Sequence, residues 1–468
     1  MSGAARPNGS VLIHVDERRR DIPLLLALRR LLEQRGFRVI LSTRRTTAAY
    51  LRGVPVDAIV VPSLLHLPYD ELPRICARSK IYMLPTEGAL FEELPLLVKY
   101  GGGTDPKRWA RQIQATTRFF LWGEYSRRVL RATGRFRDDQ LVVVGAPRMD
   151  FFLVDPSAEE RARHAPRSLG LLSDFVLLNS YHPRPIFELT DGGRHCHGIY
   201  HAPTRGIEDR FWIEMAWMRV WLELLEECQK RQERLRLRIH PREDLGNYRY
   251  LEARYGEILG FEDPNVPFES WLERVEILLG YNSTAFFEVV AANKPAINLE
   301  GLVGPRLAEH VDGFQQSHYP VMDHIPTPGS LEELFRMIRR MRDGQWVAAQ
   351  CYGAECRALL QDVCHYPRST AALAAVVQTI VDDLEGAGLD KRWSHRVAGA
   401  LGGWEAKALE AVSFTVLRNP VTSMWFPMRD GRFARQHAAE IARYVRAAER
   451  FPASGSASDE VAERCAAS

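Results

Sequence analysis

Two places in the sequence bring polar side chains to the point where a short strand-like run ends. The run at 235–239 leads into His240, and the apolar run at 277–280 leads into a polar turn. Such short runs predict buried strands, and in an open α/β sheet ligands bind at the carboxyl ends of strands. We therefore expect one anion site made of these residues: His240, Pro241, Asn282, Ser283 and Thr284.

The second of these turns leads into a predicted helix over 285–292, which Lys294-Pro295 ends. Ser283 and Thr284 stand at its start, where hydroxyl side chains cap helices well. The free N–H groups and the dipole at a helix start also attract a phosphate. Capping and phosphate binding use the same geometry, so both roles are compatible.

Two further residues in the first half of the chain follow predicted strands. Glu87 lies in a Pro-Thr-Glu-Gly turn after the apolar run at 81–84, where a carboxylate could act as a general acid or base. Its alternative role is to cap a helix beginning near Ala89. Arg148 follows the apolar run at 141–144 and could meet a carboxylate bidentately, or form a salt bridge between lobes.

A second His-Pro-Arg string begins at His182, after a predicted strand over 175–180, and rivals His240 for the phosphate role. We favour His240 because of its order relative to the Ser-Thr turn. The loop at 181–204 is long and His-rich, and loops of that length are usually functional or disordered. The spacing in His195-Cys196-His197 fits no zinc pattern, so we expect no metal and no other cofactor.

Composition narrows the class of protein. The 468 residues carry a formal net charge of +3 with both signs interspersed, which does not indicate a nucleic-acid binder. Seven scattered cysteines favour a reducing compartment over a disulfide framework. No apolar run is long enough to cross a bilayer, and the first residues lack the apolar core of a signal peptide. We expect a cytoplasmic protein whose membrane contact, where there is any, is peripheral at the inner membrane.

Strand-like runs alternate with helical patterns through most of the chain, which predicts doubly wound parallel sheets. We expect an N-terminal Rossmann-like lobe over 1–155 and a second over 156–330, with residues 156–170 as the link. A helical extension is expected over 331–451, and a disordered Ala/Ser-rich tail over 452–468.

The His-Pro string, the Ser-Thr turn and Asn293-Lys-Pro295 together resemble the nucleotide-sugar half of GT-B glycosyltransferases. More narrowly, they resemble bacterial sialyltransferases and Kdo (3-deoxy-manno-octulosonate) transferases, and the surface-carbohydrate biosynthesis proteins that include the retaining β-Kdo transferases. Residues 145–150, Gly-Ala-Pro-Arg-Met-Asp, are similar to a Gly-x-Pro-Arg-x-Asp turn of the same family, with Ala146 in place of the common Asn.

This resemblance implies an α/β GT-B fold, with two Rossmann-like lobes facing a cleft. It also implies transfer of a CMP-activated ulosonic acid such as Kdo to a glycan acceptor in bacterial surface polysaccharide assembly. His240 would then donate to the nucleotide phosphate, and Arg148 would bind the sugar carboxylate. Arg242 and Glu243 would reach the ribose, or merely cap the next helix.

Glu87 would lie in the acceptor lobe and deprotonate the acceptor of an inverting enzyme. A retaining enzyme needs a nucleophile, for which we choose Asp209 over Glu208 and Asp191, although Asp at a helix start is commonly an N-cap. Two alternatives stay open. One is a GT-B enzyme that uses a UDP- or GDP-sugar, or a CDP-glycerol-type phosphotransferase. The other is a non-catalytic binding protein within a polysaccharide-assembly complex.

Overall fold

The computed structural model describes residues 8–16, 18–43, 46–103, 105–156, 168–173, 175, 204–240, 243, 245–263, 265–281, 283–308, 319–345, 352–385 and 431–453. The chain divides into two compact units. Unit 1 comprises Met1–Ser157 and Gln361–Ser468, and unit 2 comprises Ala158–Leu360.

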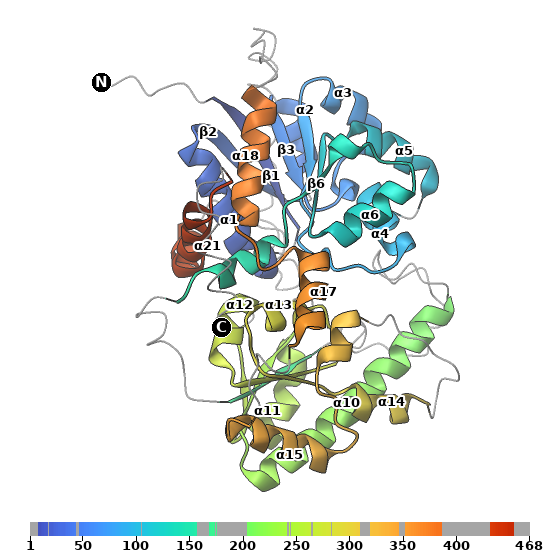
Figure 1. Ribbon diagram of the computed structural model, residues 1–468, viewed down its shortest axis with the longest axis vertical. Coiled ribbons are helices and arrows are strands. Elements are labelled where there is room, and N and C mark those ends of the chain that lie inside the picture. The colour runs from blue at the N-terminus through green and yellow to red at the C-terminus, as the bar shows by residue number, and fades with distance from the viewer. Residues whose placement is uncertain are drawn as a thin grey trace. The chain divides into compact units, whose positions relative to one another are not determined.

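Unit 1 is built on a six-stranded sheet in the order β2-β1-β3-β4-β5-β6, and every pair of neighbouring strands is parallel (Figure 1). The predicted alternation of strands and helices in this lobe is confirmed. In chain order, the strands are β1 (Gly9–Val15), β2 (Phe37–Thr43), β3 (Ala58–Val61), β4 (Lys80–Met83), β5 (Arg118–Leu121) and β6 (Leu141–Val143).

Helices cover both faces of this sheet. Side chains alternate along a strand, so Val11, Ile13 and Val15 of β1 face one layer of helices, whereas Leu12 faces the other. The first layer comprises α1 (Arg18–Gln34), α18 (Ala372–Glu385) and α21 (Ala438–Arg450), side by side in Figure 1. The second comprises α2 (Thr47–Gly53), α3 (Leu72–Cys76), α4 (Glu93–Gly101), α5 (Pro106–Ala115) and α6 (Glu124–Ala132).

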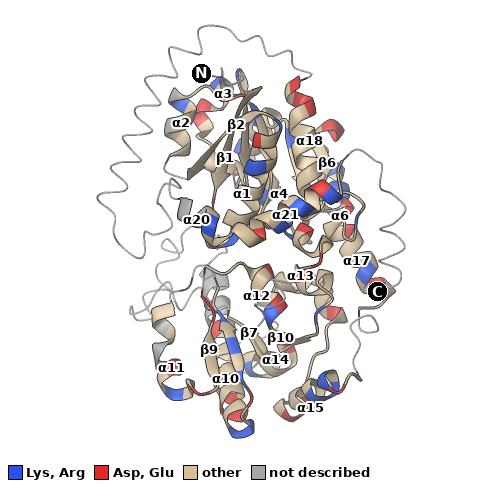
Figure 2. Ribbon diagram, turned by 90° about the vertical axis from the view of Figure 1, so that its left-hand side faces the viewer, with Lys and Arg blue, Asp and Glu red and all other residues tan. Residues whose placement is uncertain are grey.

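Unit 2 holds a five-stranded parallel sheet in the order β11-β10-β7-β8-β9. Its strands are β7 (Leu169–Leu172), β8 (Leu235–Arg238), β9 (Leu259–Phe261), β10 (Ile277–Gly280) and β11 (Ala296–Asn298). The connecting helices are α10 (Thr204–Arg231), α11 (Arg249–Tyr255), α12 (Phe268–Arg274), α13 (Ala285–Ala291), α14 (Glu300–Ala308) and α15 (Leu331–Arg342). Charged residues of both signs are spread over both units (Figure 2).

The predicted position of the first strand of unit 2, residues 175–180, is wrong. β7 begins within the last two residues of the predicted link, at Leu169, and ends at Leu172, before the predicted strand, of which residues 176–180 lie outside the described residues. Gly170 interrupts the apolar run of β7, yet the strand needs it, because a Cβ there would lie 2.7 Å from the Val275 side chain.

The prediction of a separate helical extension over 331–451 is wrong. Leu334, Phe335 and Ile338 of α15 belong to the apolar core of unit 2. The helices α18 and α21 instead cover the sheet of unit 1. The boundary between the units falls within α17 (Ala354–Cys364). Amphipathic helices look alike whichever sheet they cover, so the sequence pattern could not assign them.

Apart from residues 452 and 453, the predicted disordered tail over 452–468 lies outside the described residues. Within the described ranges, none of the helices combines the length and apolar character that crossing a bilayer requires.

Candidate functional site

The candidate site of unit 2 is the edge of the sheet where β7, β8 and β10 end. From β7 the chain proceeds to β8 and β9 on one side, and then returns to β10 and β11 on the other side. The crevice at such a reversal, outside the carboxyl ends of the strands, is where open α/β sheets bind ligands. Here the reversal lies between β7 and β10.

The two predicted turns lie at this edge. Arg238 of β8 is in register with Leu172 of β7, and Leu279 of β10 is in register with Leu171. His240 follows β8, and Ser283 follows β10, so they flank the end of β7 at the same edge of one sheet. With strands about 4.8 Å apart, β8 and β10 are separated by about 10 Å. Pro241, Arg242 and Asn282 lie outside the described residues.

Glu243 fixes the turn after β8. Only 2% of its surface is exposed, and it accepts hydrogen bonds from the Ser173 hydroxyl and the Phe175 backbone N–H. The Tyr248 hydroxyl also donates to Glu243 Oε2, at 2.9 Å, as does the His240 backbone N–H, at 3.1 Å. Buried protein donors therefore surround its carboxylate, and contact between Glu243 and a nucleotide stays a prediction.

The position of His240 follows from this arrangement. Its backbone N–H also donates to Ser173 Oγ at 2.9 Å, which joins the ends of β7 and β8. The His240 side chain is half-buried. The carboxylate of Glu243 thus holds the backbone of the residue whose imidazole was predicted to bind phosphate.

The two hydroxyls of the Ser-Thr turn differ in whether they cap the helix that follows. Ser283 Oγ accepts from the Ala285 backbone N–H at 3.2 Å at the start of α13, whereas the Thr284 side chain makes no capping bond to the helix. Both residues are half-buried. Since α13 has only seven residues, its dipole is modest, and the hydroxyls are the groups of interest here.

In unit 1, Glu87 lies in the turn after β4, at the carboxyl edge of the sheet. Its side chain is 54% exposed and pairs with the Arg20 guanidinium. Arg20 also pairs with Asp21, at 2.6 Å, and donates to Thr86 Oγ1 at 3.0 Å. The next helix, α4, begins at Glu93, so Glu87 does not cap a helix beginning near Ala89.

The electrostatics of this turn depend on the opposite charges around Arg20. Burial disfavours the charged guanidinium, but Asp21 and Glu87 outweigh it and raise the pKa of Arg20 well above its ordinary value. Burial also lowers the pKa of the nearby Lys99 ammonium, while Glu87 opposes that shift. The guanidinium therefore remains charged and holds the Glu87 carboxylate in place.

Gly88 is required where this turn passes over an aromatic ring. A Cβ on Gly88 would lie 2.7 Å from the Trp122 indole ring, whose Nε1 donates to the Pro85 carbonyl at 3.0 Å. The glycine of the Pro-Thr-Glu-Gly string is therefore needed because the backbone at Gly88 lies directly against the Trp122 ring. It keeps the Glu87 turn against β5.

The Gly-Ala-Pro-Arg-Met-Asp string anchors the C-terminal part of unit 1. Asp150 is fully buried and pairs with Arg368. It also accepts from the backbone N–H groups of Ala372, at 2.9 Å, and Leu373, at 2.8 Å, at the start of α18. Arg148 lies in the same 3₁₀ segment, Pro147–Leu153, and its carbonyl accepts from the Tyr444 hydroxyl.

Asp209 does not precede a helix as predicted. The helix α10 begins at Thr204, so Asp209 lies within it, and its side chain is outside what the structure describes. Sequence reasoning also missed Arg20 and Ser173, the partners that position the two turns. Arg20 lies in the first turn of α1, in a run of charged residues that gives no sequence signal of a distant partner.

No protein-family model matches the sequence, and no curated protein matches it. Solved structures do match its fold. A structure of the wall teichoic acid polymerase TagF, a variant soaked with CDPG, has a TM-score of 0.51 and 14% sequence identity. The match covers 81% of this chain and 90% of that one. The fold is GT-B.

Two further solved structures are similar at lower scores. The UDP-GlcNAc 2-epimerase of Methanocaldococcus jannaschii, in complex with UDP-GlcNAc and UDP, has a TM-score of 0.45 and 11% identity over 80% of this chain and 99% of that one. S. aureus MnaA with UDP has a TM-score of 0.45 and 10% identity over 82% of this chain and 98% of that one. At these identities the likeness concerns the fold.

Proposed function

We propose that the protein is a glycosyltransferase that takes its donor sugar from a nucleotide. More narrowly, we propose a CMP-activated ulosonic acid such as Kdo as donor and a bacterial surface glycan as acceptor. One observation carries this proposal. The turns holding His240 and Ser283-Thr284 flank the reversal point of the second sheet. The narrower choice of donor is supported by the resemblance of these turns to CMP-sugar transferases.

In the proposed donor site, the imidazole of His240 donates to a phosphate oxygen of the nucleotide. It offsets the charge that develops as the bond to the sugar breaks and CMP leaves with the electron pair. The Ser283 and Thr284 hydroxyls donate to the same phosphate. Glu243 keeps its carboxylate on the protein and holds the backbone of His240, so the site is preorganised before the donor binds.

In the proposed acceptor site, Arg20 positions Glu87. In an inverting reaction the Glu87 carboxylate takes the proton of the acceptor hydroxyl as its oxygen attacks the anomeric carbon. In a retaining reaction the Asp209 carboxylate attacks first and forms a glycosyl–enzyme intermediate. The acceptor hydroxyl then displaces Asp209. We propose Arg148 as the partner of the sugar carboxylate.

A CDP-glycerol-type phosphotransferase is the second candidate. It is supported by the TagF structure, which shares the fold and was soaked with CDPG. Both candidates use a cytidine nucleotide, so cytidine preference alone does not separate them. Turnover of CMP-Kdo against CDP-glycerol separates the two candidates. The reaction of CMP-Kdo releases CMP and transfers a sugar, whereas the reaction of CDP-glycerol releases CMP and transfers glycerol phosphate.

The first experiment is thermal unfolding of the full chain with CMP, CDP, UDP or GDP. A nucleotide at 100 times its Kd stabilises the folded state by about 2.7 kcal/mol. We expect CMP to raise the Tm most, and His240→Ala to abolish this rise while the Tm without nucleotide stays unchanged. The matched control is His324→Ala, a half-buried histidine of the same unit, in Pro320–His324. An equal rise with GDP, or a normal CMP response in His240→Ala, would contradict the proposal.

A further inference from the structure

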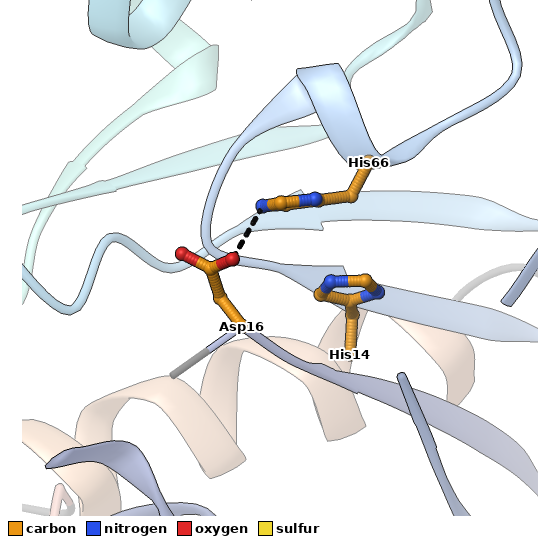
Figure 3. Close-up of side chains that lie close together, drawn as sticks. All are labelled: His14, Asp16 and His66. Atoms are coloured by element: carbon orange, nitrogen blue, oxygen red, sulfur yellow. Dashed lines mark ion pairs between the residues drawn. The ribbon is translucent and has the colours of Figure 1, made fainter. Parts of the chain in front are cut away.

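Three side chains able to bind a metal gather at the reversal point of the first sheet, which lies between β1 and β3. His14 lies near the end of β1, and Asp16 follows that strand. His66 ends a 3₁₀ turn, Leu64–His66, which follows β3. Figure 3 shows the two imidazoles one above the other, with the Asp16 carboxylate beside His66.

The three groups lie close enough for an ion to bridge them after a small side-chain movement. One ligand atom from each residue lies within 4.8 Å of the other two. His66 Nε2 and Asp16 Oδ1 are 3.4 Å apart, which is long for a charge-assisted hydrogen bond of about 2.7–2.9 Å. Two ligands of a tetrahedral ion with bonds of about 2.1 Å are separated by about 3.4 Å.

A hydrogen-bond chain lies behind His14 and is compatible with the tautomer that a metal ligand needs. The Thr47 hydroxyl donates to the Thr43 carbonyl at 2.8 Å, and its oxygen lies 2.7 Å from His14 Nδ1. Ser42 Oγ lies 2.8 Å from the same Thr47 oxygen. With the Thr47 proton placed on the Thr43 carbonyl, His14 Nδ1 is the donor to Thr47, and Nε2 then carries the lone pair. Histidine ligands of metals almost always donate their other ring nitrogen in this way.

We propose that His14, Asp16 and His66 form a binding site for a first-row divalent transition ion, with Zn²⁺ as the representative. Two imidazoles and one carboxylate suit such an ion better than Mg²⁺ or Ca²⁺, which prefer oxygen ligands. The His14 ring is buried, whereas the Asp16 side chain is 37% exposed and gives the ion a path from solvent.

Binding requires a small side-chain movement. The rings are stacked, with centroids 4.1 Å apart and 20° between their planes, so their lone pairs do not converge on one point. Two ligands at about 2.1 Å from an ion are at most about 4.2 Å apart. Rotation of the His66 side chain brings its Nε2 toward the ion and leaves the buried, hydrogen-bonded His14 ring in place.

The charged groups around the site leave one net negative charge, which the ligand Asp16 itself supplies. The carboxylates of Asp16, Asp21 and Glu87 interact with two cationic side chains. These are Arg20 and Lys99. Three protein ligands leave a fourth position of a tetrahedral ion for water or a hydroxyl, as in catalytic zinc sites. This inference rests on the three side chains and their neighbours, and it does not depend on the proposed donor or acceptor.

The experiment titrates chelator-treated full-length protein with Zn²⁺ by isothermal titration calorimetry. His195, Cys196 and His197 lie outside the described residues, so all proteins carry the background changes His195→Ala, Cys196→Ser and His197→Ala. We expect one Zn²⁺ per chain, a loss of affinity of at least about 100-fold in His66→Ala and Asp16→Asn, and a loss of about 10- to 100-fold in Thr47→Val. The control His324→Ala should bind as tightly as its parent.

Co²⁺ provides a second readout, because a tetrahedral site with nitrogen and oxygen ligands gives strong visible absorption. We expect this absorption in the parent protein and its loss in His66→Ala. Circular dichroism of His66→Ala and Asp16→Asn establishes that both remain folded, since these side chains lie at the rim of the site. Affinity for Zn²⁺ weaker than about 1 mM in the parent, or unchanged affinity in both variants, overturns the proposal.

Discussion

Asp150 and Arg368 lie 218 positions apart in the sequence and form an ion pair that is buried in the core of unit 1. Asp150 also accepts two backbone N–H groups at the start of α18, and Arg368 donates to the Ala146 carbonyl at 3.1 Å. The pair therefore connects the turn after β6 to the segment of chain that returns from unit 2. It explains why the string at 145–150 ends in an aspartate.

We expect Asp150→Asn to lower the free energy of unfolding of unit 1 by about 3–5 kcal/mol, because it leaves a buried guanidinium without its counter-charge. The double variant Asp150→Asn/Arg368→Met should be less destabilised than the sum of the single changes. Urea denaturation measures all three. The exposed Asp382→Asn in α18 is the control and should stay within about 0.5 kcal/mol of the parent. Additive single effects would show that the pair is not coupled.

Glu243 should matter for the protein without any ligand. Glu243→Gln replaces an acceptor of several hydrogen bonds with an amide that must also donate, so we expect a loss of about 2 kcal/mol or more in the stability of unit 2. The exposed Glu257→Gln should have no comparable effect. Unchanged stability of Glu243→Gln, together with weaker nucleotide binding, would instead support a direct contact between the Glu243 carboxylate and the nucleotide.

Glu87→Gln tests the proposed base. Turnover should fall by about 10²- to 10⁴-fold, and donor affinity measured by calorimetry should stay within about twofold. Arg20→Met should lower kcat in the same direction, because Arg20 holds the carboxylate without itself taking the proton. The nearby exposed Glu92→Gln serves as the control. Normal turnover in Glu87→Gln would remove this residue from catalysis.

Asp209→Ala tests the retaining course. If the wild type forms a covalent sugar adduct that intact-mass measurement detects, the adduct should be lost in this variant and kept in the neighbouring Glu208→Gln. Persistence of the adduct in Asp209→Ala would assign the nucleophile to another carboxylate. A wild type that forms no adduct would instead favour the inverting course through Glu87.

Lys99 should make the stability of unit 1 depend on pH. Burial lowers its pKa in the folded state below the ordinary value of 10.5, so between these two values the unfolded chain binds more protons and stability rises with pH. We expect Lys99→Met to be more stable than the parent near neutral pH, with a difference that shrinks as the pH approaches about 10. Urea denaturation across this range measures it, with the exposed Lys107→Met as the control. A difference that grows with pH would contradict the assignment.

The strands of unit 1 could be predicted from the sequence because each is a compact apolar run between polar segments. The second sheet was harder, since β7 has only four residues and one of them is Gly170. The edge of the sheet that carries His240 and Ser283 was predicted correctly, because polar residues followed the strand-like runs directly. Those runs are β8 and β10.

What the sequence could not provide was the set of long-range partners. The pairing of Arg20 with Glu87 spans 67 positions, and Ser173 meets Glu243 across 70. A charged residue beside a candidate site looks the same in sequence whether it binds a ligand or holds a neighbour. Glu243 is the case in point, because its contacts with Ser173 and Tyr248 could not be predicted from the sequence.

Unit 1 is assembled from both ends of the chain, with unit 2 inserted between them. On the ribosome, β1 to β6 emerge long before α18 and α21, so the part of one sheet face that α1 does not cover stays exposed until residues 372–450 have been made. Exposed apolar surface of this kind promotes aggregation during synthesis. A nascent chain interrupted before residue 372 would therefore carry a sheet with one face covered by α1 alone, and such a product is a natural substrate for chaperones that bind apolar surfaces.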